Sequence, residues 1–243
     1  MAIATTSPVT GEVLKSFDAL TAEELEDKLG RAAAAAASYR LTSVEQRAEW
    51  LGQAADHLEK EADSVSKLIT TEMGKIYRAA QEEVAKCVRG LRFYAAEGPV
   101  FLKNLRADAS RVGAKETYVT YQPIGPVLAV MPWNLPLWQA MRFAAPALTA
   151  GNVGLLKHAS NVPQTALYME QLFRDAGFPD DVFQTLLIPS GQVEQVLRDE
   201  RVKAATSLRP DSVANGPTSV ASSIGSPTTS APILATNRSR NAS

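Results

Sequence analysis

The sequence predicts an α/β fold: a helical N-terminal layer, a parallel sheet with helices on both faces, and a disordered C-terminal tail. Helix signals dominate residues 21–96, and short apolar runs alternate with helical segments over residues 127–199. Strands that alternate with helices are typical of parallel sheets, whose connections are right-handed by default. After residue 206 the composition changes abruptly to one rich in Ser, Thr and Pro.

The first hundred residues predict an extended arm and then three helices. Capping boxes at Thr21–Glu24 and Ser43–Gln46, in which the residues at the two ends cap each other's backbone N–H groups, begin the first two helices. Gly74 suits the left-handed conformation that ends a helix. The predicted segments are an arm over 1–20 and helices over 21–37, 43–73 and 76–96, the last ending near Gly98-Pro99.

A βαβ unit within residues 123–161 is the part of the chain on which the site prediction depends. Its first strand ends in Pro132-Trp-Asn-Leu-Pro136, where two prolines fix the backbone around one amide side chain. Ligands of such sheets bind beyond the carboxyl ends of the strands, where Asn134 and Lys157 both fall. The unit comprises a buried strand over 127–131, a helix over 137–150 and a buried strand over 153–156.

Four more elements are predicted around this unit. Residues 115–122 alternate β-branched and aromatic side chains, which is typical of a strand. Gly177-Phe-Pro179 ends the helix that follows the βαβ unit. The remaining elements are a helix over 163–176, a buried strand over 182–188 and a short helix over 192–199.

Composition and charge restrict the class of protein. Hydrophobic residues make up 45% of the chain and charged residues 21%, values ordinary for a soluble globular protein. A net charge of −1 favours neither nucleic acid nor an anionic membrane surface as a partner. The single cysteine, Cys87, excludes an internal disulfide. With no signal peptide or membrane span in the sequence, we expect a cytoplasmic protein.

The C-terminal segment, residues 207–243, is predicted to be disordered. It holds nine Ser, four Thr and four Pro, and only four charged residues. Such a segment buries too little apolar surface to offset the entropy lost on ordering it.

Over about residues 5–206 the chain resembles the N-terminal half of the NAD(P)-dependent aldehyde dehydrogenases, and among them the succinate-semialdehyde dehydrogenases most of all. The resemblance implies a partial N-terminal and cofactor-binding domain over 1–206 with a Rossmann-like sheet, a tail over 207–243, and no catalytic domain. It also implies NADP as cofactor, a small aldehyde as substrate and homo-oligomeric relatives. The resemblance rests on these matches: Glu72-Met-Gly-Lys75, Pro132–Pro136, Pro146–Asn152, Lys157 and Gly177-Phe-Pro179.

The resemblance implies roles for five residues. Asn134 matches the asparagine whose amide stabilises the oxyanion of the thiohemiacetal intermediate, a task that requires a rigid neutral donor. Trp133 matches a residue that lines the cofactor cleft, and Lys157 the lysine that binds the adenine ribose. Ser160 falls where many NAD-preferring members carry a glutamate, and a hydroxyl there favours the 2′-phosphate of NADP. Arg142 matches an arginine expected to bind the distal carboxylate of succinate semialdehyde.

Four of these five residues also have a structural interpretation. Asn134 is a plausible turn residue between prolines, and Arg142 an exposed or ion-paired helical arginine. Lys157 at a strand end is a solvated terminus in that view, and Ser160 a cap of the following helix. Glu72 and Lys75 are assigned to packing and capping. His57 and His158 lack partners at metal-ligand spacing, which argues against a metal site.

The family's glycine-rich turn, general-base glutamate and nucleophilic cysteine find no match in this sequence. Cys87 lies on the apolar face of a predicted helix and is interpreted as a small buried hydrophobe. We therefore expect no dehydrogenase turnover from the chain as given. A frameshift or truncation of the gene at codon 206 is our hypothesis for the abrupt change, and a natural linker or tail is the alternative. Two alternatives are a nucleotide-binding module without catalysis and a fragment that does not fold stably.

Overall fold

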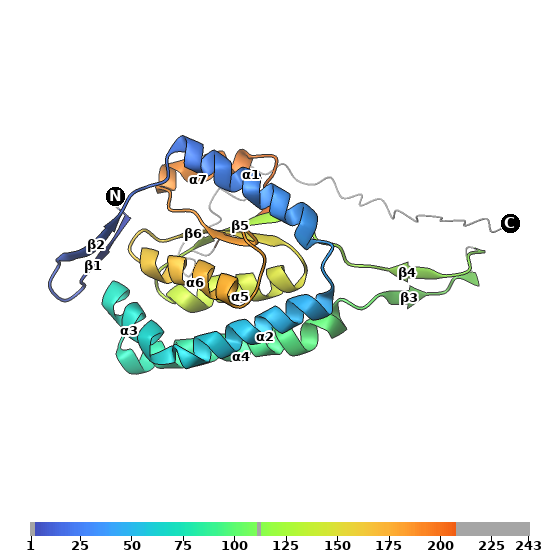
Figure 1. The fold of residues 1–243 in the computed structure, drawn as a ribbon, viewed down its shortest axis with the longest axis horizontal. Coiled ribbons are helices and arrows are strands. Elements are labelled where there is room, and N and C mark those ends of the chain that lie inside the picture. Colours follow the sequence, from blue (N-terminus) through green and yellow to red (C-terminus); the bar gives the residue numbers. More distant parts are fainter. Residues whose placement is uncertain (1–2, 111–112, 208–243) are drawn as a thin grey trace, which may run out of the picture. The chain divides into compact units, whose positions relative to one another are not determined.

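The computed structural model describes residues 3–110 and 113–207 (Figure 1). The predicted disordered tail lies, from residue 208 onward, outside the described residues. Chain order is as follows: β1 (Ile3–Thr6), β2 (Val13–Phe17), α1 (Ala22–Tyr39), α2 (Val44–Lys60), α3 (Ala62–Met73), α4 (Tyr77–Phe101), β3 (Leu105–Ala107), β4 (Thr117–Val119), β5 (Pro126–Met131), α5 (Pro136–Thr149), β6 (Val153–His158), α6 (Pro163–Asp175), β7 (Phe183–Thr185), the 3₁₀ turn η2 (Ser190–Gln192), α7 (Val193–Arg198) and β8 (Ala204–Ser207).

A four-stranded sheet in the order β7-β6-β5-β8 organises the chain, and each adjacent pair is parallel. Helix α5 connects β5 to β6, and helix α6 connects β6 to β7. The predicted α/β fold with a parallel sheet is therefore confirmed. Strand β8 was not predicted, because its four residues, AATS, carry no β-branched or aromatic run.

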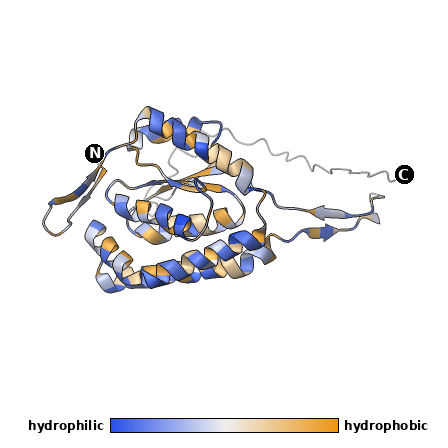
Figure 2. Cartoon of the chain, viewed as in Figure 1, coloured by the Kyte–Doolittle hydropathy of each residue, from blue (hydrophilic) through white to orange (hydrophobic). Residues whose placement is uncertain are grey.

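Helices cover both faces of this sheet (Figure 1). Alternate residues of β5 and β6 point to opposite faces: Ala129 and Leu156 pack with α2–α6, whereas Leu128 and Leu155 pack with α1 and α7. The apolar stripes of the helices face these two cores and their outer faces are polar (Figure 2). Helices α2–α4 therefore form a layer against α5 and α6, whereas α1, which the sequence places in the same helical layer, covers the opposite face of the sheet with α7.

Two predicted helices have different boundaries. The segment over 43–73 is two helices that meet at Glu61, whose backbone leaves the helical region at φ −96° and ψ 10°. Its apolar periodicity continues through the break because both helices bury a face in the same core. Helix α4 extends to Phe101 and contains Pro99. The missing N–H of Pro99 affects only the last turn of α4, so the helix is not broken.

The extended segments also differ from the prediction. The arm over residues 1–20 is a two-stranded antiparallel hairpin of β1 and β2. The strand predicted over 115–122 is only Thr117–Val119, and it pairs with β3 in a second hairpin rather than joining the main sheet. Ser43 accepts a hydrogen bond from Gln46 N as predicted, but Gln46 Nε2 contacts Glu49, so this capping box is incomplete. At Thr21 both capping bonds are present.

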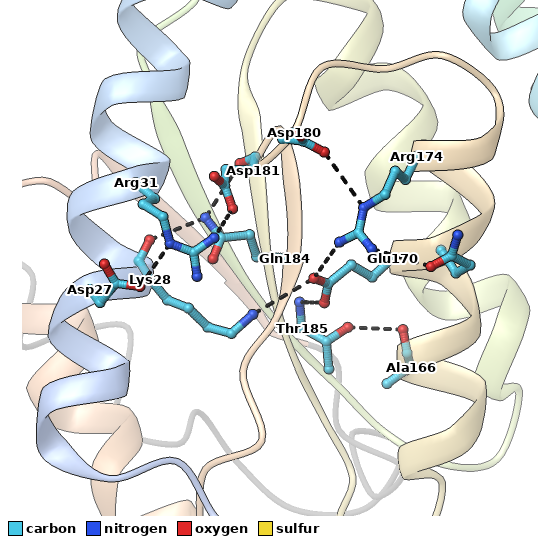
Figure 3. A network of polar contacts seen from close by, with 11 residues as sticks. Asp27, Lys28, Arg31, Ala166, Glu170, Arg174, Asp180, Asp181, Gln184 and Thr185 are labelled. Atoms are coloured by element: carbon cyan, nitrogen blue, oxygen red, sulfur yellow. Dashed lines mark hydrogen bonds and ion pairs between the residues drawn. The ribbon is translucent and has the colours of Figure 1, made fainter.

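The edge strand β7 is held between α1 and α6 by polar contacts (Figure 3). Glu170 on α6 accepts a hydrogen bond from Thr185 N at 2.7 Å and lies 3.7 Å from Lys28 Nζ on α1. Gln184 Nε2 donates to the Lys28 carbonyl oxygen at 3.1 Å. Side chains from both faces thus cover the free edge of β7, a common protection against edge-to-edge pairing. None of the helices among the described residues has the length and apolar character needed to cross a membrane.

Helices α4 and α5 approach closely at Gly98, and this contact predicts the effect of a substitution. A Cβ at residue 98 would lie 2.3 Å from Cγ2 of Thr149. We expect Gly98→Ala to lower the free energy of unfolding by about 1–3 kcal/mol in urea titrations, although alanine is the better helix former. Gly52→Ala on α2 meets no atom within 4 Å and is the control. A Gly98→Ala protein as stable as Gly52→Ala would contradict this contact.

Candidate functional site

The carboxyl ends of β5 and β6 lie side by side, and the loops that follow them form the candidate site. Met131 and His158 are paired at the end of the parallel ladder. The loops over 132–135 and 159–162 therefore start from neighbouring positions, so the structure brings the loops of Asn134 and Ser160 together. The prediction that Lys157 follows its strand is wrong, since β6 continues to His158.

Asn134 is exposed, and its side-chain amide has a defined orientation. Its Oδ1 accepts a hydrogen bond from Leu135 N at 3.1 Å. Within the described part of the chain, Nδ2 makes no hydrogen bond, so its two N–H donors are available to a ligand. Trp133 beside it is 45% exposed.

Helix α5 begins without a cap of its own. Its N-cap residue is Leu135, and Pro136 occupies the first turn. Glu83 on α4 supplies the missing acceptor: its Oε1 accepts hydrogen bonds from Leu137 N at 3.0 Å and from Trp138 N at 2.9 Å. The other oxygen of this buried carboxylate contacts Lys75 Nζ. A carboxylate at the positive end of a helix is also favoured by the helix dipole.

Helix α6 begins in the same way. Its N-cap residue, Val162, has no side-chain cap bond, and Pro163 follows. The buried carboxylate of Glu72 accepts hydrogen bonds from Gln164 N at 2.8 Å and Thr165 N at 2.9 Å. It also accepts from two hydroxyls, Thr5 Oγ1 at 2.8 Å and Thr165 Oγ1 at 2.6 Å.

We call the carboxylates of Glu83 and Glu72 imported caps, because each caps a helix to which it does not belong. They distinguish between the roles that the sequence suggested for Glu72, Lys75 and Ser160. Glu72 caps α6, and Lys75 neutralises the carboxylate that caps α5, which agrees with their assignment to packing and capping. Ser160 does not cap α6, because Glu72 does. Helix N-termini often bind phosphate. In α5 and α6 the free N–H groups are already bound to protein carboxylates, so a cofactor phosphate would have to bind elsewhere.

His158 fastens the end of β6 to the start of α5. Its ring is buried; Nε2 donates to the Pro136 carbonyl oxygen at 2.8 Å, and Nδ1 accepts from Ala159 N at 2.8 Å. Both contacts require the neutral ring protonated on Nε2. Burial lowers the pKa of His158 to about 4, and the neighbouring Lys157 contributes in the same direction.

Lys157 lies near the carboxyl end of β6, and Ser160 lies in the loop that follows this strand. Lys157 is buried rather than solvated; its Nζ donates to the His158 carbonyl oxygen at 2.7 Å, and burial lowers its pKa. Ser160 is partly exposed, and its carbonyl oxygen accepts from Ala4 N of β1 at 3.1 Å. A crevice of about 10 Å³ beside Ser160, lined by Ile3, Pro163 and Ile188, has room for about one water molecule.

Arg142 lies on the exposed side of α5, two turns after Asn134. Its guanidinium forms no ion pair or hydrogen bond with other described residues, so the ion-paired interpretation finds no partner there. Trp138, one turn earlier, stacks under Lys86 Nζ at 4.1 Å from the ring centre. Arg142 and Trp138 therefore lie one turn apart on α5, and the cation over the Trp138 ring belongs to α4.

Cys87 is fully buried on α4, and burial raises the pKa of its thiol well above the ordinary range. Both properties disfavour the thiolate that nucleophilic attack requires. The interpretation of Cys87 as a buried hydrophobe agrees with this position. In residues 3–110 and 113–207 no cluster of three His, Cys, Asp or Glu has the arrangement of a metal site.

The sequence analysis did not identify the roles of two residues that hold the site, Glu83 and His158. Glu83 lies on the buried face of α4, in step with Ala80, Val84, Cys87 and Leu91. A charged residue in such an apolar stripe requires a partner, and that signal was available. His158 was treated as a minor departure from the family pattern, and nothing in the sequence indicates its contact with Pro136, 22 residues away.

Known proteins resemble this chain over most of its described length. It is 56% identical over 206 residues to succinate-semialdehyde dehydrogenase [NADP(+)] 1 of Mycobacterium tuberculosis and 54% identical to succinate-semialdehyde dehydrogenase [NADP(+)] of Mycobacterium leprae. These matches cover 85% of this chain and 45% of each relative, so the chain spans about half the length of the curated relatives it matches. Succinic semialdehyde dehydrogenase from Streptococcus pyogenes, solved with NADP+, superposes with a TM-score of 0.80 at 35% identity, over 85% of this chain and 45% of that one.

The family assignment agrees with the motifs from which the resemblance was first inferred. Residues 1–208 match the aldehyde dehydrogenase family, well over half of the chain. The two loops at the carboxyl end of β5 and β6, with their imported caps, lie within this match. The chain therefore belongs to the aldehyde dehydrogenase family.

Proposed function

We propose that this chain is the cofactor-binding part of an NADP-dependent succinate-semialdehyde dehydrogenase. The observation that carries the proposal is the amide of Asn134 in an exposed, proline-bounded loop: its Oδ1 accepts from Leu135 N, and its two Nδ2 protons have no partner among the described residues. Donors that are rigid before the reaction stabilise developing negative charge without reorganisation. The similarity to NADP-dependent relatives supports the same assignment.

The residues around Ser160 fit NADP. The ammonium of Lys157 has a neutral carbonyl oxygen as its hydrogen-bond partner, so its positive charge is not cancelled. The loop over 159–162 carries no carboxylate that would repel a 2′-phosphate. When bound, NADP accepts the hydride. We propose that Lys157 and Ser160 orient its adenine ribose and that Trp133 lines the cofactor cleft.

We assign the substrate-side roles to Asn134 and Arg142. Asn134 donates to the aldehyde oxygen as negative charge develops on it, and Arg142 binds the distal carboxylate through paired hydrogen bonds. The chain's single cysteine is buried and protonated. We therefore propose that the chain by itself binds NADP but does not turn over. Reduction of NADP by the purified chain with succinate semialdehyde would contradict this.

Thermal melting of the purified chain with and without NADP tests the cofactor assignment. NADP at 100 times its Kd should raise the free energy of unfolding by about 2.7 kcal/mol, with a smaller effect from NAD. Ser160→Glu should weaken NADP binding at least about tenfold, because a carboxylate near the 2′-phosphate costs several kcal/mol at short range. Ser64→Glu, on the exposed side of α3, is the control. Equal shifts with NAD and NADP would contradict the assignment.

A further inference from the structure

We propose that Glu83 is a positioning residue for Asn134 and that its pairing with Lys75 keeps it in that role. The inference rests on the proposed function of Asn134, since positioning matters only if that amide acts on a substrate. It assigns to the Glu72-Met-Gly-Lys75 motif a specific task at the site. The contacts that carry it run from Lys75 to Glu83, from Glu83 to the first turn of α5, and from there to the loop.

The first turn of α5 needs a cap from another helix, because no side chain of the preceding loop accepts its N–H groups. The side chain of Leu135 has no acceptor, Pro136 has no N–H, and Asn134 has the only side-chain acceptor in Pro132–Pro136. If Asn134 capped Leu137 and Trp138, its amide would be turned toward the helix. Glu83 accepts from both N–H groups instead. The side chain of Asn134 remains free to bind Leu135 N through Oδ1 and to expose Nδ2.

The ion pair with Lys75 compensates the charge of the buried Glu83 carboxylate. The side chain of Glu83 is 2% exposed and that of Lys75 is 12% exposed, so neither charge is well hydrated. A buried charge without a partner is strongly destabilising. With one oxygen on Lys75 and the other on two backbone N–H groups, the carboxylate has a single orientation. Lys75 itself follows Gly74, whose φ of 75° ends α3 and starts the turn.

The geometry makes a distinctive prediction for amide substitutions at Glu83. In Glu83→Gln, an amide that keeps its oxygen on Leu137 N and Trp138 N must turn its NH₂ group toward the Lys75 ammonium. We expect this repulsion to loosen the first turn of α5 and with it Asn134. In the double variant Lys75→Met/Glu83→Gln the repulsion is gone, the amide oxygen still caps α5, and the order of Asn134 should return.

Side-chain amide signals of Asn134 in ¹⁵N NMR spectra of the full chain test this directly. In Glu83→Gln we expect the heteronuclear NOE of Asn134 Nδ2 to fall, and exchange of the Leu137 and Trp138 amides to accelerate about tenfold or more, the equivalent of losing a charge-assisted hydrogen bond. Glu82→Gln, on the exposed side of the same helix, and Lys67→Met, in an exposed pair with Asp63, should match the parent chain. The double variant should lie within about twofold of the parent exchange rates.

Three outcomes would overturn the proposal. The first is an unchanged Asn134 signal in a folded Glu83→Gln protein, and the second is a double variant more disordered than Glu83→Gln. If Glu83→Gln does not fold, the parent chain decides: Leu137 and Trp138 amides that exchange as freely as uncapped first-turn amides would overturn it, and protected ones would support it. NADP is absent from these measurements. Failure of the proposed function would appear in the melting experiment instead, so the two failures are distinguishable.

Discussion

Replacing Glu72 by Gln should be among the most destabilising single substitutions in this chain. The carboxylate is 2% exposed and accepts four hydrogen bonds, two from backbone N–H groups and two from hydroxyls. A glutamine would place an NH₂ group against at least one N–H donor of Gln164 or Thr165. We expect a loss of about 3 kcal/mol or more in the free energy of unfolding, because charge-assisted bonds are lost and buried donors are left unpaired.

Urea titration followed by circular dichroism measures this loss. Glu61→Gln is the matched control, since Glu61 also accepts from α6, at Tyr168 Oη, but at an exposed position where the amide oxygen can replace the carboxylate. We expect its effect to be below about 1 kcal/mol. A Glu72→Gln protein within 1 kcal/mol of the Glu61→Gln protein would show that the cap of α6 contributes little.

The second large effect is a loss of stability as pH falls, caused by His158. The folded-state pKa of about 4 lies below the ordinary value of 6.5. Above pH 6.5 the ring is neutral in both states and contributes no pH dependence. Between pH 6.5 and about 4 the unfolded chain takes up a proton that the folded chain excludes, so stability falls as pH falls. Over this pH range the free energy of unfolding should fall by about 3 kcal/mol.

Unfolding in urea at several pH values between 7 and 4 tests this effect. His158→Gln retains a donor for the Pro136 carbonyl oxygen and has no charge to gain, so most of the slope over this range should disappear. His57, the chain's other histidine, is partly exposed on α2, and His57→Gln is the control. If His158→Gln and the parent chain lose stability equally over this range, the buried ring is not the cause.

The fold was largely predictable because its main elements have local signals. The apolar runs of β5 and β6, the full capping box at Thr21 and the left-handed Gly74 each depend on nearby residues. The break at Glu61 and the short strand β8 were missed for the opposite reason. The apolar periodicity continues across the break at Glu61. The residues of β8, AATS, form a strand only by pairing with β5.

The candidate site was predictable in its loops and not in what holds them. Asn134 and Ser160 could be located from motifs that lie next to predicted strands. The caps from Glu72 and Glu83 join residues 92 and 54 positions apart, and no local pattern indicates such partners. Lys157 shows the same limit, because its burial depends on the strand that continues past it.

The imported caps have a consequence for synthesis on the ribosome. A helix that carries its own cap can start as soon as it emerges, whereas α5 and α6 have apolar N-cap residues and depend on carboxylates made earlier. Since chains emerge from the N-terminus, Glu72 and Glu83 are already outside the ribosome when these two helices appear. The carboxylates that cap α5 and α6 are therefore synthesised before the helices that need them. A circular permutation that started the chain after α4 would reverse that order while keeping the residues that form both caps.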